Sequence, residues 1–181
     1  MKEISLNILD IAENSVKAGA TLTEITVNET DDTLTLKISD NGCGMTAETL
    51  KAVTDPFYTT RTTRKVGMGL PLLKMEAEQT GGTFGISSKA ESEYPEDHGT
   101  EVLAVFNKKH IDYTPLGDVV SSIVTLIQGH PDTDFLFTHT CGSKSVTLDT
   151  RELRAVLEEV PLNSYEVLKF IEETLRKEEN I

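Results

Sequence analysis

The segment Asp40-Asn41-Gly42-Cys43-Gly44-Met45 places a carboxylate beside two glycines. It follows a run in which Leu34, Leu36 and Ile38 alternate with polar residues, a pattern typical of a half-buried strand. Such a strand delivers Asp40 to its C-terminal end, where α/β sheets commonly open to ligands. A carboxylate there can accept a hydrogen bond from an amino group, and the glycines leave room for a ligand. A tight turn with a capping aspartate is the alternative explanation of this segment alone.

A second polar group lies on a helix that apolar residues at helical spacing predict from Ile4 to Ala18. Asp10 and Asn14 are one turn apart and share a face, and Lys17 follows along nearly the same edge. An asparagine carbonyl can ligate a hard cation such as Mg²⁺, and an aspartate can orient or deprotonate a nucleophile. Together the three could serve a polyphosphate. A solvated polar face is the alternative explanation.

Two later segments also favour phosphate binding. Residues 55–65 have no periodicity and combine hydroxyl groups with Arg61, Arg64 and Lys65, which indicates a surface loop that can bind phosphate or a loop with no role. Gly67-Met68-Gly69-Leu70 then leads into a predicted helix, so its backbone N–H groups and the positive end of the helix dipole can face an anion. This is not the dinucleotide-binding fingerprint, because no third glycine follows at the required spacing.

Periodicity and turn signals predict the elements that position these groups. The expected strands are 22–28, 34–39, 83–88 and 101–107, and the expected helices are 4–18, 47–53 and 70–80. The turn at Thr30–Thr33 joins the first two strands into an antiparallel hairpin. The last strand is apolar throughout Val102–Phe106, which predicts that both of its faces are covered.

Residues 110–181 predict a small α/β extension, and we expect the chain to divide into a domain 1–109 and this extension 110–181. The expected elements are a helix 116–128, a hairpin of 135–137 with 145–148, a helix 151–159 and a last helix to about residue 178. This part shows no acid–base or metal-binding pattern in its sequence, and we interpret His130 and His139 as ordinary polar residues. Its role stays open.

Composition excludes several classes of protein. The 181 residues are 38% hydrophobic without an apolar run near twenty residues, which indicates a globular chain without a membrane span. The first residues lack a signal-peptide pattern. A net charge of −13 argues against broad binding to nucleic acid or anionic membranes. Cys43 and Cys141 form no CxxC motif, so we expect free thiols in a reducing cytoplasm.

Four separated motifs and a later Gly-Thr pair occur in an order that resembles the GHKL superfamily of gyrase, the heat-shock chaperone, histidine kinases and MutL mismatch-repair ATPases. Asp10-Ile11-Ala12-Glu13-Asn14-Ser15-Val16-Lys17-Ala18-Gly19-Ala20-Thr21 resembles its N box. Asp40 to Met45 resembles its G1 box. Asp55-Pro56-Phe57-Tyr58-Thr59-Thr60-Arg61 resembles its F box, Gly67 to Leu70 its G2 box, and Gly99-Thr100 its final Gly-Thr. The resemblance covers residues 4 to about 108.

The resemblance implies the Bergerat fold, an α+β two-layer sandwich whose mixed, mostly antiparallel sheet is covered by helices on one face. It implies ATP and Mg²⁺ as ligands. Asp40 would bind the adenine amino group, Asn14 would ligate Mg²⁺, and Arg61 or Lys65 would close over the phosphates. The implied nucleotide-binding residues are Asn14, Asp40, Gly42, Gly44, Met45, Phe57, Thr60, Arg61, Gly67, Met68, Gly69, Leu70 and Thr100.

The resemblance leaves the reaction open, with Asp10 and Lys17 as the catalytic candidates. The ATPase branches usually carry glutamate where this chain has Asp10, and a base displaced by about 1 Å can lower a rate on the order of 100-fold. Lys17 and the F box resemble the kinase branch, whereas the sequence from Asn14 to Thr21 resembles the MutL type.

Two functions therefore stay open, beside a third in which the site is degenerate. The first is a kinase acting on a separate partner protein, because the chain begins too close to the N box for a histidine-bearing dimerisation hairpin. The second is a slow ATPase or nucleotide-operated switch that regulates partner binding or dimerisation. We expect the protein to bind ATP, ADP and a partner protein, and to bind neither nucleic acid nor membrane. An oligomer is compatible with this sequence.

Overall fold

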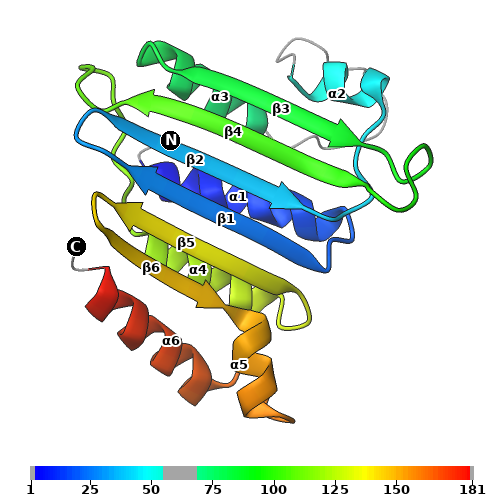
Figure 1. The fold of residues 1–181 in the computed structure, drawn as a ribbon, viewed down its shortest axis with the longest axis vertical. Coiled ribbons are helices and arrows are strands. Elements are labelled where there is room, and N and C mark those ends of the chain that lie inside the picture. The colour runs from blue at the N-terminus through cyan, green and yellow to red at the C-terminus, as the bar shows by residue number, and fades with distance from the viewer. Residues whose placement is uncertain (1–2, 55–68, 180–181) are drawn as a thin grey trace.

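The structure, a computed structural model, describes residues 3–54 and 69–179. One six-stranded sheet runs through it in the order β3-β4-β2-β1-β5-β6 (Figure 1). Neighbouring strands are antiparallel except β1 and β5, which are parallel. The elements are α1 (Ile4–Lys17), β1 (Leu22–Glu29), β2 (Thr33–Asp40), α2 (Ala47–Thr54), α3 (Gly69–Gln79), β3 (Thr83–Lys89), β4 (Gly99–Asn107), α4 (Val119–Gly129), β5 (Asp134–Cys141), β6 (Lys144–Asp149), α5 (Thr150–Leu157) and α6 (Tyr165–Glu178). This mixed, mostly antiparallel sheet confirms the predicted α+β sandwich.

The helices α1, α3 and α4 lie on one face of the sheet, with α1 behind β1 and β2 and α4 behind β5 (Figure 1). Apolar side chains alternate along the strands and point to that face, so the core forms between the two layers. Fully buried members come from both layers: Ile4, Ile8, Ile25, Leu34, Leu36, Ile38, Leu73, Phe106, Ile123, Leu126, Phe135 and Phe137. The predicted hairpin of the first two strands is confirmed, with Ile25 opposite Ile38.

The prediction that both faces of the strand 101–107 are covered is wrong. Burial alternates along β4, and Leu103, on the face away from the helices, is 39% exposed. Because helices cover only one face of the sheet, the other side of β4 faces solvent in spite of its apolar residues. A short apolar run therefore predicted the strand but not its surroundings.

The predicted hairpin of the C-terminal part is confirmed as β5 and β6, and β5 joins the sheet beside β1. The parallel register runs from Leu22 opposite Asp134 to Glu29 opposite Cys141. Behind this pair, α4 packs between α1 and α6. Residues after 110 thus contribute strands and a helix to the same layers as those before it, and one hydrophobic core includes side chains from both.

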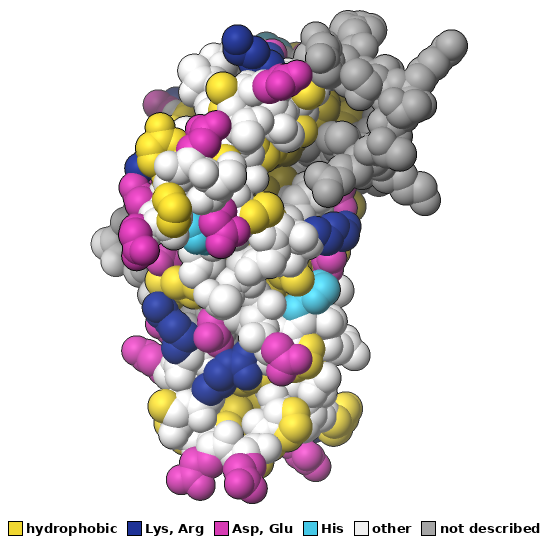
Figure 2. Space-filling model, turned by 90° about the vertical axis from the view of Figure 1, so that its right-hand side faces the viewer, with side chains coloured by type: hydrophobic (Ala, Val, Ile, Leu, Met, Phe, Trp, Pro, Cys, Tyr) yellow, Lys and Arg dark blue, Asp and Glu magenta, His cyan; other side chains and the backbone are white. Residues whose placement is uncertain are grey.

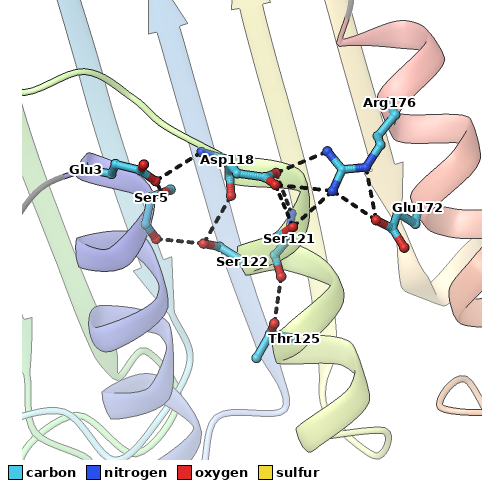
Figure 3. A network of polar contacts seen from close by, with 8 residues as sticks. All are labelled: Glu3, Ser5, Asp118, Ser121, Ser122, Thr125, Glu172 and Arg176. Atoms are coloured by element: carbon cyan, nitrogen blue, oxygen red, sulfur yellow. Dashed lines mark hydrogen bonds and ion pairs between the residues drawn. The ribbon is translucent and has the colours of Figure 1, made fainter.

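A polar network at the N-terminus of α4 joins three helices (Figure 3). Asp118 caps α4 by accepting hydrogen bonds from the backbone N–H of Ser121 at 2.9 Å and from its hydroxyl at 2.7 Å. Arg176 of α6 lies 3.2 Å from Asp118, and Ser122 donates to the carbonyl of Ser5 in α1 at 2.9 Å. The ion pair between Arg176 and Asp118 is nearly half exposed and contributes little to stability. The buried hydrogen bond from Ser122 to Ser5 instead fixes how α4 packs on α1.

His139 connects the C-terminal residues to β1. Its Nδ1 lies 2.8 Å from a carboxylate oxygen of Glu179, and its Nε2 lies 3.1 Å from one of Glu29. Both ring nitrogens must carry a proton to donate to both carboxylates. Burial lowers the pKa of His139, but the hydrogen bonds and negative charges of Glu179 and Glu29 outweigh it, and the pKa is raised above its usual value.

Both cysteines, Cys43 and Cys141, are free thiols, as expected. Within residues 3–54 and 69–179, none of the helices has the length and apolarity needed to cross a lipid bilayer.

Candidate functional site

The carboxylate of Asp40 lies at the C-terminal end of β2 and is already oriented by two donors. The hydroxyl of Ser15 in α1 lies 2.7 Å from its Oδ2, and the backbone N–H of Gly42 lies 2.9 Å from its Oδ1. In the sheet, Asp40 is directly opposite Thr23 of β1 and Thr100 of β4. A carboxylate has about four lone-pair positions, so these two bonds leave it able to accept a further hydrogen bond.

Three contacts hold the loop after Asp40 against the end of α1 and the start of β1. The side-chain oxygen of Asn41 accepts hydrogen bonds from the backbone N–H of Thr21 and Leu22, at 2.9 and 3.0 Å. The N–H of Cys43 donates to the carbonyl of Ala18 at 2.9 Å. These contacts hold the loop next to α1, the helix that carries the other predicted site residues.

The two glycines of this loop are required by close packing. A Cβ at Gly42 would lie 2.9 Å from the Cβ of Ala18, and one at Gly44 would lie 1.9 Å from the carbonyl oxygen of Lys89. Gly44 also has φ +61°, a conformation that L residues rarely adopt. Without side chains, the loop passes directly between the end of α1 and the end of β3.

Two hydroxyl groups, from β3 and β4, contact the other side of the loop that follows Asp40. The N–H of Met45 donates to the Ser88 hydroxyl at 2.8 Å, and that hydroxyl lies 2.8 Å from the hydroxyl of Thr100 and 2.9 Å from the carbonyl oxygen of Gly99. The structure thus places five residues of the predicted site close together: Asp40, Gly42, Gly44, Met45 and Thr100.

The polar face of α1 carries Asp10, Asn14 and Lys17. Asp10 and Lys17 are exposed and Asn14 is partly exposed, and within the described ranges their side chains make no hydrogen bond or ion pair. The first residue of α3, Gly69, packs on this face, since a Cβ there would lie 3.2 Å from the Cβ of Asp10. The next residue of α3, Leu70, packs against the core. Asp10 and the beginning of α3 are therefore neighbours, and Asn14 lies one helical turn further along α1.

The remaining predicted site residues, Phe57, Thr60, Arg61, Gly67 and Met68, lie outside the described residues, as do Arg64 and Lys65.

Four residues of the site were not predicted: Ser15, Thr23, Ser88 and His98. Ser15 and Thr23 face Asp40, and Nδ1 of His98 lies 2.6 Å from the carbonyl oxygen of Gly42. The sequence signal for Ser15 was its place in the N box, next to Asn14. His98 carries no pattern of its own, and its contact joins residues 56 positions apart.

The arrangement fits a magnesium-bound nucleotide. The Thr23 hydroxyl is fully buried opposite Asp40 and has no hydrogen-bond partner among the described residues. In the same part of the chain, no three His, Cys, Asp or Glu side chains converge on one metal position. The carbonyl oxygen of Asn14 is one ligand that Mg²⁺ could take here, with phosphate oxygens of a nucleotide as further ligands.

The side of the molecule on which β2 ends carries acidic side chains among scattered lysine and arginine residues (Figure 2). Acidic groups gather at its lower end, where Figure 1 places α5 and α6. This distribution agrees with the net charge of −13 and offers no broad attraction to a polyanion on the face shown.

Residues 2–110 match the family described as histidine kinase-, DNA gyrase B-, and HSP90-like ATPase. The chain belongs to this family. It therefore carries a GHKL-type ATP-binding domain, in a family of ATPases and histidine kinases whose domains bind Mg-ATP. The motifs recognised in the sequence, Asp10 to Thr21, Asp40 to Met45 and Gly99-Thr100, lie within the matched range.

Curated relatives are sensor proteins. A putative sensor protein of Shewanella frigidimarina is 28% identical over 107 residues, which are 59% of this chain and 15% of that protein. A probable C4-dicarboxylate sensor kinase of Bacillus subtilis is 33% identical over 86 residues, 48% of this chain and 15% of that protein. The chain thus spans about 15% of the length of these relatives.

Two solved structures share the fold. The Aquifex aeolicus MutL ATPase domain complexed with ADP superimposes with a TM-score of 0.51 at 14% identity, over 87% of this chain and 70% of that one. The N-terminal domain of a DNA repair protein gives a TM-score of 0.54 at 14% identity, over 82% of this chain and 53% of that one. Each superposition covers a larger fraction of this chain than residues 2–110 make up. The common fold therefore extends into the residues after 110.

Proposed function

We propose that this protein binds Mg-ATP beside α1, with the adenine at Asp40 and the phosphates toward Asn14 and Gly69, and that it transfers the γ-phosphate to a separate partner protein. The observation that carries the first part is the Asp40 carboxylate, which Ser15 and Gly42 hold in place while it can still accept an amino hydrogen. A carboxylate positioned in this way distinguishes a base with an exocyclic amino group from one with a carbonyl oxygen.

Each residue along α1 would have a separate task. Asp40 would accept the adenine amino hydrogen, and the Asn14 carbonyl oxygen would hold Mg²⁺, which neutralises phosphate charge when bound. Next to the start of α3, Asp10 would orient the acceptor or take its proton at a carboxylate oxygen, and Lys17 would face the phosphates. The exposed side chains of Asp10 and Lys17 support this, because a phosphoryl acceptor on another protein must reach them.

The proposed transfer breaks the bond between the γ-phosphorus and the bridging oxygen of ATP and forms a bond from that phosphorus to the acceptor side chain. ADP leaves with the bridging oxygen. The acceptor on the partner is a histidine, a serine or another nucleophilic side chain. The likeness to sensor kinases supports transfer rather than hydrolysis, as does Lys17 within the N box.

A slow ATPase that switches partner binding is the second candidate, and the attachment of α4 favours it. His130, which follows α4, lies 2.7 Å from Glu13, which is next to Asn14 in α1. A displacement of Asn14 on nucleotide binding would therefore be transmitted through Glu13 and His130 to α4 and to β5, the strand that follows it. This candidate predicts that ATP, compared with ADP, changes oligomeric state or affinity for a partner, and unchanged values of both would exclude it.

Calorimetric titration with ATP and ADP, with and without Mg²⁺, tests the binding that both candidates share. Phosphate release and transfer of labelled phosphate to proteins encoded in the genomic neighbourhood then separate them. Label on a partner, lost when Asp10 or Lys17 is replaced by alanine, is the result expected of the kinase. Binding with slow phosphate release and no labelled partner would favour the switch, and no binding at all would refute both.

A further inference from the structure

His98 fastens the loop that follows Asp40. It lies just before β4, at the end of the connection from β3, and its Nδ1 is 2.6 Å from the carbonyl oxygen of Gly42. A carbonyl oxygen can only accept, so Nδ1 carries the proton and donates it. The same connection makes a backbone contact with the loop, since the N–H of Glu91 donates to the carbonyl of Cys43 at 2.9 Å.

Gly42 is one of the two residues that orient Asp40, the other being Ser15. On its N-terminal side, its N–H donates to Oδ1 of Asp40 at 2.9 Å. On its C-terminal side, the next peptide group is held at both ends, by the Cys43 N–H on the carbonyl of Ala18 and by His98 on the Gly42 carbonyl. Glycine has the widest backbone freedom of any residue, so these contacts, rather than its own preferences, set its conformation.

We propose that His98 is a positioning residue for recognition of a 6-aminopurine base. By holding the Gly42 carbonyl, the imidazole keeps the Gly42 N–H on Oδ1 of Asp40 and so aims the carboxylate that receives the amino group of the base. His98 acts through Gly42 and Asp40 and needs no contact with the nucleotide. The inference rests on the proposed function, because it gives His98 a role in the adenine recognition assigned to Asp40.

Side-chain geometry provides a selective test. An asparagine at this position can place its amide nitrogen near the position of Nδ1, whereas glutamine carries its amide one methylene further from the backbone. His98→Asn should therefore keep the bond to Gly42, and His98→Gln and His98→Leu should lose it. His110→Leu is a matched control, because the Nδ1 of His110 accepts a hydrogen bond from the N–H of Asp112 at 3.2 Å, within its own segment and outside the loop.

The experiment is calorimetric titration of the full chain and these variants with ATP and with ADP, accompanied by thermal unfolding. His98→Leu and His98→Gln should bind both nucleotides roughly three- to tenfold more weakly, as expected for one lost hydrogen bond. The reduction in affinity should be equal for ATP and ADP, because both contain the same base. The affinities of His98→Asn and His110→Leu for both nucleotides should stay within about twofold of the unmodified chain. The first variant keeps the hydrogen bond to Gly42 and the second does not affect it.

Three results would overturn the inference. One is normal ATP affinity in folded His98→Leu, or in His98→Gln if the leucine variant fails to fold. Another is His98→Asn binding as weakly as His98→Leu, which would show a structural role without the donor. The third is a loss of affinity for ATP but not for ADP, which would place the effect at the phosphates. Absence of binding by the unmodified chain would instead refute the proposed function itself.

Discussion

Replacing Asp40 by asparagine is the sharpest perturbation of the proposed adenine site. The two side chains have the same shape, but the substitution turns one carboxylate oxygen into an N–H₂ donor and removes the charge. Gly42 presents an N–H to Oδ1, so the amide oxygen must occupy that position and the amide nitrogen must replace Oδ2. The Ser15 hydroxyl, 2.7 Å away, can rotate and accept from that nitrogen.

This rearrangement keeps both internal hydrogen bonds and removes an acceptor that the base needs. The free energy of unfolding should therefore change by less than about 1 kcal/mol. Binding should lose a charge-assisted hydrogen bond and place a donor against a donor, about 2–3 kcal/mol, since bonds to charged groups contribute at the upper end of the range. The dissociation constant should rise roughly 30- to 150-fold.

Calorimetric titration with ATP and with ADP measures the effect, and the rise should be the same for both nucleotides. Asp31→Asn is the matched control, because Asp31 is an exposed residue in the turn at the opposite end of the same hairpin. Asp31→Asn should bind nucleotide normally. If Asp40→Asn bound ATP within about twofold of the unmodified chain while remaining folded, the assignment of the base to Asp40 would be refuted.

Three other residues give independent predictions. Asn14→Ala should lower ATP affinity in Mg²⁺ to the value measured in a chelator, without a change in thermal midpoint, because it removes the proposed protein ligand of the metal; calorimetry with and without Mg²⁺ checks this. Gly44→Ala should destabilise the fold more than Gly142→Ala in urea denaturation. Both glycines have φ near +60°, about 1–2 kcal/mol of strain for alanine, but only at Gly44 would the Cβ meet a backbone oxygen, at 1.9 Å. Because the pKa of His139 is raised in the folded state, its contribution to stability is complete below the usual value of 6.5 and is lost as the pH rises through the higher folded pKa. Thermal unfolding at a series of pH values should show that decline in the unmodified chain, with the slope reduced in His139→Gln; an identical slope would show that another group titrates.

The elements that were predicted well depend on residues close together in the sequence. Alternation of Leu34, Leu36 and Ile38 predicted β2, and the Thr30–Thr33 turn predicted the hairpin, because strand period and turn chemistry are local properties. The helix predicted at 151–159 is likewise local: it is seen as α5, where the Asp149 carboxylate caps the first turn by accepting the N–H of Arg151 at 2.9 Å.

The features that were not predicted depend on which elements meet. Nothing local shows that β5 pairs with β1, because the two strands are more than a hundred residues apart and parallel pairing leaves no turn signal. The apolar run in β4 could not reveal that one of its faces lies open. The donors around Asp40 behave the same way: the carboxylate was predicted from its own segment, whereas Ser15 reaches it from α1 across the fold.

The most direct measurement of the central claim is a crystal structure of the protein with Mg²⁺ and a non-hydrolysable ATP analogue. The account predicts the adenine amino nitrogen within about 3 Å of the Asp40 carboxylate and the metal on the Asn14 carbonyl oxygen. A nucleotide bound elsewhere, or a base whose amino group faces another acceptor while Asp40 keeps only Ser15 and Gly42 as partners, would contradict it.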